Sequence, residues 1–461
     1  MAVAASPLLR TPASSTPEVT LENDQMAADF QRAARSRRAF APARVLIHAI
    51  NYAPELIGCA KYTTELAEFL ASRGHSVEVV TAPPHYPGWF VREPYRCWWY
   101  SRERMGQVAI TRCPIVMKTN GGRIWRALAP LTFAMCAAPM VVWRILRSRP
   151  DVVLCIEPTL FSSPAALFAA KMIGARAVLH VQDLEVDAAF EIGQIKGGLK
   201  KLAFALERRV LGAYDRIVTI SEKMRAALLG KGLEAAQVEV LRNWVDLERI
   251  RPQPNRRANS YRGELAIAAG VFVVLYAGHI GAKQALHVVL DAARRLTNSP
   301  DILFVIAGEG PMKRPLAETY RDLTNVLYLP LQPSERLNDL LNLANLHVLP
   351  QARRAADLVL PSKLGGMLAS GRPIVAATDA NTELGDILKG IAVIVPAEDV
   401  EELAAAILAA RREDLSAEVK RGLKLAGAMS SQRVLPLFEE ALLDARSWTE
   451  RQFEPDVAAA A

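Results

Sequence analysis

Short runs of apolar residues recur along this chain, and amphipathic stretches of helical length separate them. In the first half the apolar runs occupy 45–50, 76–82, 151–156, 175–181 and 215–221. The helical stretches between them occupy 62–73, 163–172 and 198–213. Strands that are apolar nearly throughout are typical of parallel sheets covered by helices on both faces. The pattern therefore predicts βαβ units on a parallel sheet.

The same pattern restarts after a polar, Arg-rich stretch at 249–262, which we interpret as a linker. The second series of predicted elements comprises strands at 271–278, 301–310, 325–330, 346–350 and 372–378, with a helix near 284–296. Two series in 461 residues predict two Rossmann-like α/β domains with parallel sheets that face each other across a cleft. We divide the chain into a disordered tail (1–43), the first domain (44–248), the second domain (249–430) and a C-terminal segment (431–461). In that last segment a helix at 434–448 is expected to pack back on the first domain.

Composition narrows the class of protein without choosing a function. The net charge of +8 favours phosphate-bearing ligands, anionic lipid or nucleic acid. Five cysteines without a CxxC pair indicate neither a disulfide framework nor a zinc site, and a reducing compartment fits them best. The most apolar window, 127–143, contains Pro130 and Pro139, so we expect a buried or surface-docked helix rather than a spanning one.

Two glycine-containing loops follow predicted strands. The first, NYAPELIGCAKY (51–62), places Gly58 ahead of a helix, where backbone amides and the helix dipole favour an anion. The second, YAGHIGAKQ (276–284), contributes Gly278, His279, Gly281 and Lys283. A lysine at that position can neutralise a departing diphosphate. An ordinary turn at Gly58 and a solvated Lys283 are the alternatives, and the missing G-x-G-x-x-G argues against a dinucleotide site.

A third segment, LPSKLGGMLASGRPIVAA (360–377), combines phosphate-binding residue types with small residues. Ser362 and Lys363 precede its helix, and Gly365 and Gly366 would let the helix backbone approach a ligand. Polar residues at other strand ends are further candidates. His180 and Asp183 in HVQD could orient a hydroxyl group, and Glu309 in GEGP could orient a donor. A structural histidine and a plain turn remain the alternatives.

The ordered set NYAPELIG, LASRGHSVEVVTAPPHYP, HVQD, VTISEKM, NWVD, AGHIGAKQ, IAGEGP and PSKLGGMLASGRPIVA resembles glycosyltransferase family 4, which has the GT-B fold. The resemblance covers about 44–445 and is strongest to the glycosyltransferases of colanic acid biosynthesis, which are associated with fucosyl transfer. It implies a retaining transfer that needs no metal or other cofactor. It also implies that the nucleotide diphosphate lies mainly against the second domain and the acceptor against the first.

The resemblance assigns roles to several residues. Gly58 matches the glycine loop facing the donor phosphates, Lys283 the phosphate-binding lysine, and Ser362 and Lys363 the diphosphate contacts of the closer subgroup. The chain departs from the family at His279, where many relatives have arginine. It also lacks the two glutamates of the E-x7-E motif: their positions fall at Leu358 and Gly366, and Asp357 adjoins the first.

Basic and aromatic residues are interleaved in the segment 89–147, which favours contact with an anionic membrane surface. A solvated basic face is the alternative, and no nucleic-acid recognition motif accompanies the segment. We therefore expect a protein peripheral to the cytoplasmic face of the membrane. By resemblance its donor is a nucleotide sugar, possibly GDP-fucose, and its acceptor a polyprenyl-diphosphate-linked saccharide of exopolysaccharide synthesis. Alternatives are a nucleotide-sugar epimerase of the same fold and a catalytically inactive, membrane-associated assembly component.

Overall fold

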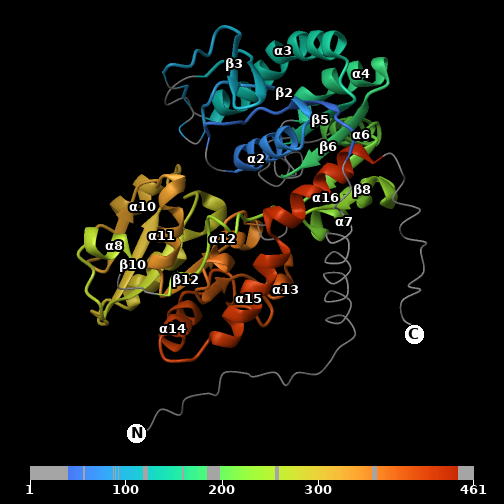
Figure 1. The fold of residues 1–461 in the computed structure, drawn as a ribbon. Helices are drawn as coiled ribbons and strands as arrows, with labels where there is room; N and C mark the ends of the chain where they lie inside the picture. The colour runs from blue at the N-terminus through green and yellow to red at the C-terminus, as the bar shows by residue number, and fades with distance from the viewer. Residues whose placement is uncertain are drawn as a thin grey trace, which may run out of the picture.

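The structure is a computed structural model containing two α/β domains (Figure 1). It describes residues 40–55, 58–86, 88, 90–91, 93–117, 123–157, 160–183, 198–254, 259–355 and 361–444. Of the expected N-terminal tail only 40–43 is described, and 445–461 also lies outside the described residues. Both sheets are parallel apart from one hairpin, which confirms the predicted α/β class.

The first domain contains, within the described residues, an eight-stranded sheet of order β3-β4-β2-β1-β5-β6-β7-β8. Its strands are β1 (Arg44–His48), β2 (Ser76–Thr81), β3 (Ser101–Met105), β4 (Val108–Arg112), β5 (Val152–Glu157), β6 (Arg176–Val181), β7 (Arg216–Thr219) and β8 (Val238–Val240). Its helices are α2 (Cys59–Ser72), α3 (Arg123–Ser148), η1 (Leu160–Ser162), α4 (Ser163–Ile173), α6 (Gly198–Gly212), α7 (Glu222–Gly230) and η2 (Ala235–Gln237). The antiparallel β3–β4 hairpin was not predicted, because β3 (SRERM) is mostly polar and lies at the sheet edge.

The second domain contains, again within the described residues, a six-stranded parallel sheet of order β11-β10-β9-β12-β13-β14. Its strands are β9 (Phe272–Ala277), β10 (Ile302–Ala307), β11 (Val326–Leu329), β12 (Leu346–Pro350), β13 (Ile374–Ala377) and β14 (Val393–Val395). Its helices are α8 (Ser260–Glu264), η4 (Ala282–Gln284), α9 (Leu286–Arg295), α10 (Lys313–Thr319), η5 (Ser334–Arg336), α11 (Leu337–Leu343), η6 (Arg353–Ala355), α12 (Leu364–Ala369), α13 (Glu383–Leu388), α14 (Val400–Ala410) and α15 (Ser416–Ala428).

The first sheet is buried on both faces because its strands are apolar at successive positions. On β1, Val45 and Ile47 belong to the core beneath α2, whereas Leu46 belongs to the core that contains Phe133 of α3. Every residue of β5 is buried. The continuous apolar runs in the sequence therefore correspond to strands enclosed between two helical layers.

The last described helix, α16 (Ser431–Leu443), returns to the first domain and packs on α2 and β5 (Figure 1). Phe438 is fully buried in the core of that domain. Glu439 accepts a hydrogen bond from the ring of His75 at 2.9 Å and is paired with Arg73 at 3.2 Å. Arg73 and His75 lie directly after the end of α2. The C-terminal helix is thus a structural part of the first domain.

The two crossings between the domains lie side by side. The N–H of Val245 donates to the carbonyl oxygen of Met429 at 2.9 Å, and the carbonyl oxygen of Val245 accepts from Ser431 at 2.9 Å. A third connection comes from Glu383 of α13, whose carboxylate accepts the backbone N–H groups of Glu222 and Lys223 at 2.9 Å each. Because these N–H groups begin α7 of the first domain, a carboxylate of the second domain caps that helix.

The polar stretch at 249–262 is bound to the second domain over its described parts, so it is not a free linker. The N–H of Gln253 donates to Asn342 at 2.9 Å. The guanidinium of Arg262 donates to the carbonyl oxygens of Ala268 and Val271 at 3.0 and 3.1 Å. The polar composition of this stretch predicted a solvated linker, because the sequence does not show which distant residues bind its side chains and backbone.

The loops after β9 and β10 pack backbone against backbone. The N–H of Gly278 donates to Ala307 at 2.9 Å, and the N–H of Ile280 donates to Glu309 at 2.9 Å. A Cβ atom added at Gly308 would lie 1.9 Å from the carbonyl oxygen of Gly278, and one at Gly310 would lie 2.3 Å from that of Ile280. Both glycines have positive φ (146° and 158°). Only glycine allows this approach.

We expect Gly308→Ala to lower the free energy of unfolding by roughly 2–5 kcal/mol, because it adds both backbone strain and a steric overlap. The matched control is Gly174→Ala, which has φ 71° but no atom within 4 Å of the added Cβ. The control should lose only about 1–2 kcal/mol. Urea unfolding of both variants measures the difference, and equal losses would contradict the close packing of these loops.

Candidate active site

Residues from both domains meet where the carboxyl ends of β1, β2 and β6 face those of β9 and β12. We call this group the interdomain site. Its members are Tyr62, Tyr86, Asp183, Tyr276, His279, Lys283, Ser362 and Lys363. Direct contacts across the domain boundary join Tyr86 to His279, Asp183 to Lys283 and Tyr62 to Ser362. Parallel α/β sheets bind ligands at these strand ends, so this is where chemistry is expected.

Lys363 carries the most unusual electrostatic environment of the site. It directly precedes α12, and its Nζ lies 3.7 Å from the centre of the Tyr276 ring. The Nζ is buried and has no hydrogen-bond partner among the described residues. Burial lowers the pKa of this lysine to about 7. A buried ammonium group without a carboxylate partner is stabilised when an anion binds next to it.

The loop after β9 makes room for that lysine. A Cβ atom at Gly278 would lie 3.2 Å from the Cδ of Lys363, and Gly278 has φ 149°. The hydroxyl of Tyr276 donates to the carbonyl oxygen of His279 at 2.5 Å, which fixes the same loop. Burial, followed by the charge of Lys363, lowers the pKa of His279. The loop therefore presents a neutral imidazole beside a buried lysine.

Lys283 lies on the short helix η4 and is paired with Asp183 of the first domain, with 3.6 Å between Nζ and Oδ2. Both side chains are about one-third exposed. The sequence placed these two residues in separate candidate segments, and the fold brings them together. Because the pair is partly solvated, an incoming diphosphate can compete with Asp183 for the lysine at modest cost.

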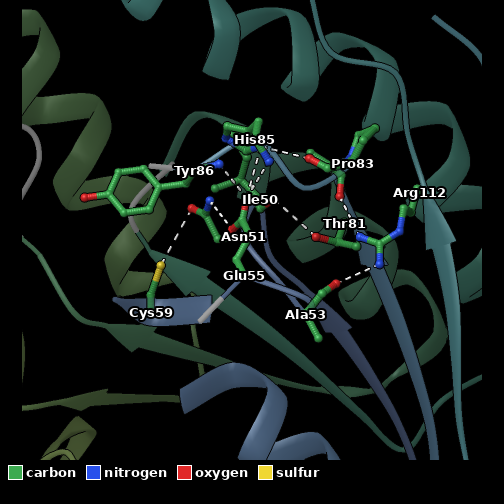
Figure 2. Close-up of polar contacts among 11 residues, drawn as sticks. Ile50, Asn51, Ala53, Glu55, Cys59, Thr81, Pro83, His85, Tyr86 and Arg112 are labelled. Atoms are coloured by element: carbon green, nitrogen blue, oxygen red, sulfur yellow. Dashed lines mark hydrogen bonds and ion pairs between the residues drawn. The ribbon is translucent and has the colours of Figure 1, made fainter. Parts of the chain in front are cut away.

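A buried carboxylate of the first domain sets the position of Tyr86 (Figure 2). Glu55 Oε1 accepts the backbone N–H groups of His85 and Tyr86 at 2.7 and 2.8 Å, and Oε2 accepts from Asn51 at 2.8 Å. The Tyr86 ring stacks on His279 with centroids 5.9 Å apart, and its hydroxyl lies 3.4 Å from Nδ1. Burial raises the pKa of Tyr86 to about 12, so the hydroxyl keeps its proton and can donate to the imidazole.

Tyr62 of α2 provides the other aromatic contact across the boundary. Its hydroxyl donates to the carbonyl oxygen of Ser362 at 3.1 Å. Its ring packs edge-on against Trp244 with centroids 5.2 Å apart, and the Trp244 indole N–H donates to Glu65 at 2.7 Å. The residue just before Lys363 is therefore held by the first domain.

The structure does not place His180 in the interdomain site, which corrects the prediction for this residue. Its side chain is 1% exposed, and its ring packs edge-on against Phe438 of α16 with centroids 4.8 Å apart. Burial lowers its pKa to about 3. A ring enclosed between β6 and α16 cannot reach a sugar, so the structural alternative holds. The sequence could not show that the C-terminal helix covers this position.

Two predicted donor glycines have a role in packing. A Cβ atom at Gly365 would lie 3.2 Å from Val245, and one at Gly366 would lie 3.2 Å from Leu341 Cδ1. Their missing side chains let α12 lie close to the domain crossing and to α11. The prediction that they bring the helix backbone near a ligand stays a prediction.

The other glycines keep positions compatible with the predicted site. Gly58 directly precedes α2 with φ 66°, and no atom lies within 4 Å of a Cβ added there. Gly281 precedes η4, and an added Cβ would meet the His279 ring at 2.8 Å. Neither position demonstrates donor binding, and both remain predictions.

The carboxylates near the site are already engaged. Glu309 accepts from Lys313 at 2.6 Å, and its carbonyl oxygen belongs to the packed glycine loops. Asp357 and Leu358, at the missing E-x7-E position, lie outside the described residues. Among the residues that are described, no group of three or more His, Cys, Asp or Glu side chains is placed to hold a metal ion.

Sequence reasoning missed Glu55, Tyr62, Tyr86 and Tyr276. Tyr86 lies in the segment TAPPHYP, whose aromatic residue in a proline-rich loop after a strand was a usable signal. Glu55 gave no such signal, because its importance comes from two backbone N–H groups about thirty positions away. Tyr276 is the last residue but one of an apolar strand and resembled an ordinary core residue.

Comparison with known proteins identifies the family. The model of the glycosyl transferase 4-like domain matches residues 58–244, and that of glycosyl transferases group 1 matches 271–412. The chain is 40% identical over 374 residues to the putative colanic acid biosynthesis glycosyl transferase WcaI of Escherichia coli (strain K12). That match covers 79% of this chain and 91% of the relative.

Solved structures share the fold. Sucrose-phosphate synthase from Thermosynechococcus elongatus has a TM-score of 0.67 at 16% identity, covering 87% of this chain and 98% of that one. The Anabaena protein HepE in complex with UDP-glucose has a TM-score of 0.62 at 13% identity, covering 86% and 98%. The chain thus has the two-domain GT-B architecture and belongs to glycosyltransferase family 4, whose members are sugar-transferring enzymes.

Proposed function

We propose that this glycosyltransferase moves a sugar from a nucleoside diphosphate to a lipid-linked saccharide in the synthesis of a colanic-acid-like exopolysaccharide. The observation that carries the proposal is the buried Nζ of Lys363 beside the glycine loop that follows β9, since this Nζ has no hydrogen-bond partner in the described part of the chain. Such a group favours an anionic ligand, and a sugar nucleotide supplies two phosphates. The identity to a colanic acid glycosyltransferase supports the same substrate class.

In this proposal two lysines stabilise the leaving nucleoside diphosphate. Lys363 contacts the phosphates from its buried position, and Lys283 exchanges its ion pair with Asp183 for a phosphate oxygen. Negative charge grows on the diphosphate as the bond to the sugar breaks, so both lysines bind the transition state more tightly than the ground state. Asp183, released from Lys283, is then positioned to accept a hydrogen bond from a sugar hydroxyl.

The transfer is proposed to retain the configuration of the sugar and to need no metal ion or other cofactor. Asp183 and Glu309 are each paired with a lysine, and Glu55 is buried in backbone hydrogen bonds. Glu309 and Glu55 are thus engaged, and this proposal assigns the released Asp183 to a sugar hydroxyl, so none of the three is given the role of covalent nucleophile. This favours same-face substitution with the leaving phosphate as proton acceptor. The donor is proposed to be GDP-fucose. The HepE relative binds UDP-glucose, so both nucleotides belong in a binding screen.

The acceptor is proposed to be a polyprenyl-diphosphate-linked saccharide at the cytoplasmic face of the membrane. The basic and aromatic segment 89–147 supports this, because arginines attract anionic headgroups and tryptophans prefer the interfacial layer. Trp98 and Trp99 are strongly exposed, and the guanidinium of Arg96 lies 5.8 Å from the Trp98 ring centre. Trp89, Arg92 and Lys118 of this segment lie outside the described residues.

Replacing either lysine should reduce transfer strongly. We expect Lys363→Met and Lys283→Ala each to lower kcat at least about 100-fold, in the range of losses for a donor that stabilises developing charge. A thermal-shift screen of nucleotide sugars first identifies the donor. Release of nucleotide from that donor is then measured with and without lipid-linked acceptor. The matched control is Lys420→Ala on the exposed surface of α15.

Near-wild-type rates from both lysine variants would contradict the proposal. Interconversion of the donor without any acceptor would instead indicate an epimerase. Absence of any reaction or binding across the screened donors would indicate an inactive assembly component.

Donor binding should weaken as the pH rises above neutral. Lys363 has a lowered pKa of about 7 in the free protein, and a bound diphosphate raises this pKa because it stabilises the ammonium form. Between the two pKa values binding takes up a proton, so affinity should fall by up to about tenfold per pH unit. Titration calorimetry with an intact sugar nucleotide, over roughly pH 6 to 9, measures the affinity at each pH. Lys363→Met should remove that dependence, and an unchanged slope in the variant would refute the assignment.

A further inference from the structure

Within the part of the chain that the structure describes, the strongly exposed large apolar side chains are confined to the first domain. In the described residues, every large apolar side chain that is strongly exposed lies between Trp98 and Leu206, and the described part of the second domain contributes none. The most exposed are Met135 (76%), Trp98 (67%), and Trp99 and Phe168 (64% each). A soluble domain seldom leaves so many large apolar side chains in contact with water without a partner.

Two neighbouring helices and the short turn that precedes the second of them carry most of these side chains. The exposed residues are Trp125, Leu128, Leu131, Met135, Trp143 and Leu146 of α3, Phe161 of η1, and Phe168 and Met172 of α4. Helix α3 packs along both α4 and η1, so the residues share one surface. Figure 1 shows α3 and α4 on the side of the first domain turned away from the second. We call this surface the α3–α4 face.

Helix α3 lies along the domain and does not stand free of it. The segment Leu128–Ser148 is long and apolar enough to cross a bilayer. However, one stripe of the helix is fully buried at every fourth position: Ala129, Phe133, Ala137, Val141 and Ile145. That stripe packs on the sheet core, while the opposite side is exposed. A helix with one face in its own domain can lie in a membrane interface but cannot span it.

The charges around this face fit an anionic lipid layer. Helices α3 and α4 contain no Asp or Glu, and their charged residues are Arg123, Arg126, Arg144, Arg147 and Lys171. Two of these are paired within the domain, Arg144 with Glu78 and Lys171 with Asp215. The guanidinium groups of Arg102 and Arg144 lie 5.1 and 5.3 Å from the Trp143 ring centre. Arginines around an exposed indole match the headgroup level of a bilayer, with the apolar side chains directed below it.

We propose that the α3–α4 face inserts into the acyl region of one leaflet of a bilayer containing anionic lipid, with α3 parallel to the membrane plane. This goes beyond headgroup contact through segment 89–147, because η1 and α4 lie outside that segment and the side chains that enter are apolar. The inference rests on the proposed function only in that a lipid-linked acceptor would need such docking. The contact itself requires no catalysis.

Vesicle flotation tests the insertion. The full chain is bound to phosphatidylcholine–phosphatidylglycerol vesicles and then brought to about 1 M salt, where charges are screened beyond about 3 Å. We expect the wild type to stay bound and Met135→Glu/Phe168→Glu to lose at least about tenfold in partitioning. The matched control, Thr319→Glu/Ala405→Glu, places two glutamates on exposed positions of the second domain and should float like the wild type. Thermal unfolding checks that both variants are folded.

A second readout distinguishes insertion from surface adsorption. Lipids brominated in the acyl chain should quench tryptophan fluorescence of the wild type, and Trp143→Phe should lose part of that quenching. Complete release at high salt, or equal flotation of the two double variants, would overturn the proposal. A concentration-dependent dimer in light scattering that Met135→Glu/Phe168→Glu abolishes would assign the face to a second copy of the chain instead.

The two proposals can fail separately. Vesicle binding without donor turnover would leave the insertion standing and remove the proposed transfer. Donor turnover with a soluble acceptor but no vesicle binding would leave the proposed transfer standing and remove the insertion.

Discussion

The paired chain crossings between the domains determine where the site residues lie. Val245 and Ser430 lie on adjacent segments, joined by backbone hydrogen bonds on both sides of the crossing. Because α16 then returns to the core of the first domain, the second domain is connected to the first domain at both its start and its end. Glu383 adds a carboxylate cap on α7. These connections bring Tyr86 to His279 and Asp183 to Lys283.

The site combines a rigid part with an electrostatically unsatisfied part. The loops after β9 and β10 are fixed by backbone hydrogen bonds and by glycines that permit contact closer than any side chain would allow. Into this frame the chain places the buried ammonium of Lys363, without a counterion among the described residues. Rigid surroundings keep the lysine in place when no anion is bound, so its desolvation is a standing cost that an anion relieves.

The fold was largely predictable because its signals are local. Continuous apolar runs predicted most of the strands in both sheets, and β5 and β12 lie within one residue of the expected limits. The mostly polar strand β3 was missed because pairing with β4, rather than its own pattern, makes it a strand. Lys283, Lys363 and Asp183 were chosen from strand-end positions, and the fold places all three in the interdomain site. His180 had the same local signal, and α16 buries it.

By itself the sequence determined the two α/β domains, the family and the loops that carry lysine next to glycine, because each depends on residue order within a short segment. Only the tertiary structure decided which of these residues meet. Glu55 orients Tyr86 from 31 positions away, and Tyr62 contacts Ser362 across 300 positions. Both sides of α3 are apolar, and only the sheet beneath the helix decides which side is buried and which is exposed. Such contacts depend on how elements pack in three dimensions, and a local pattern does not encode them.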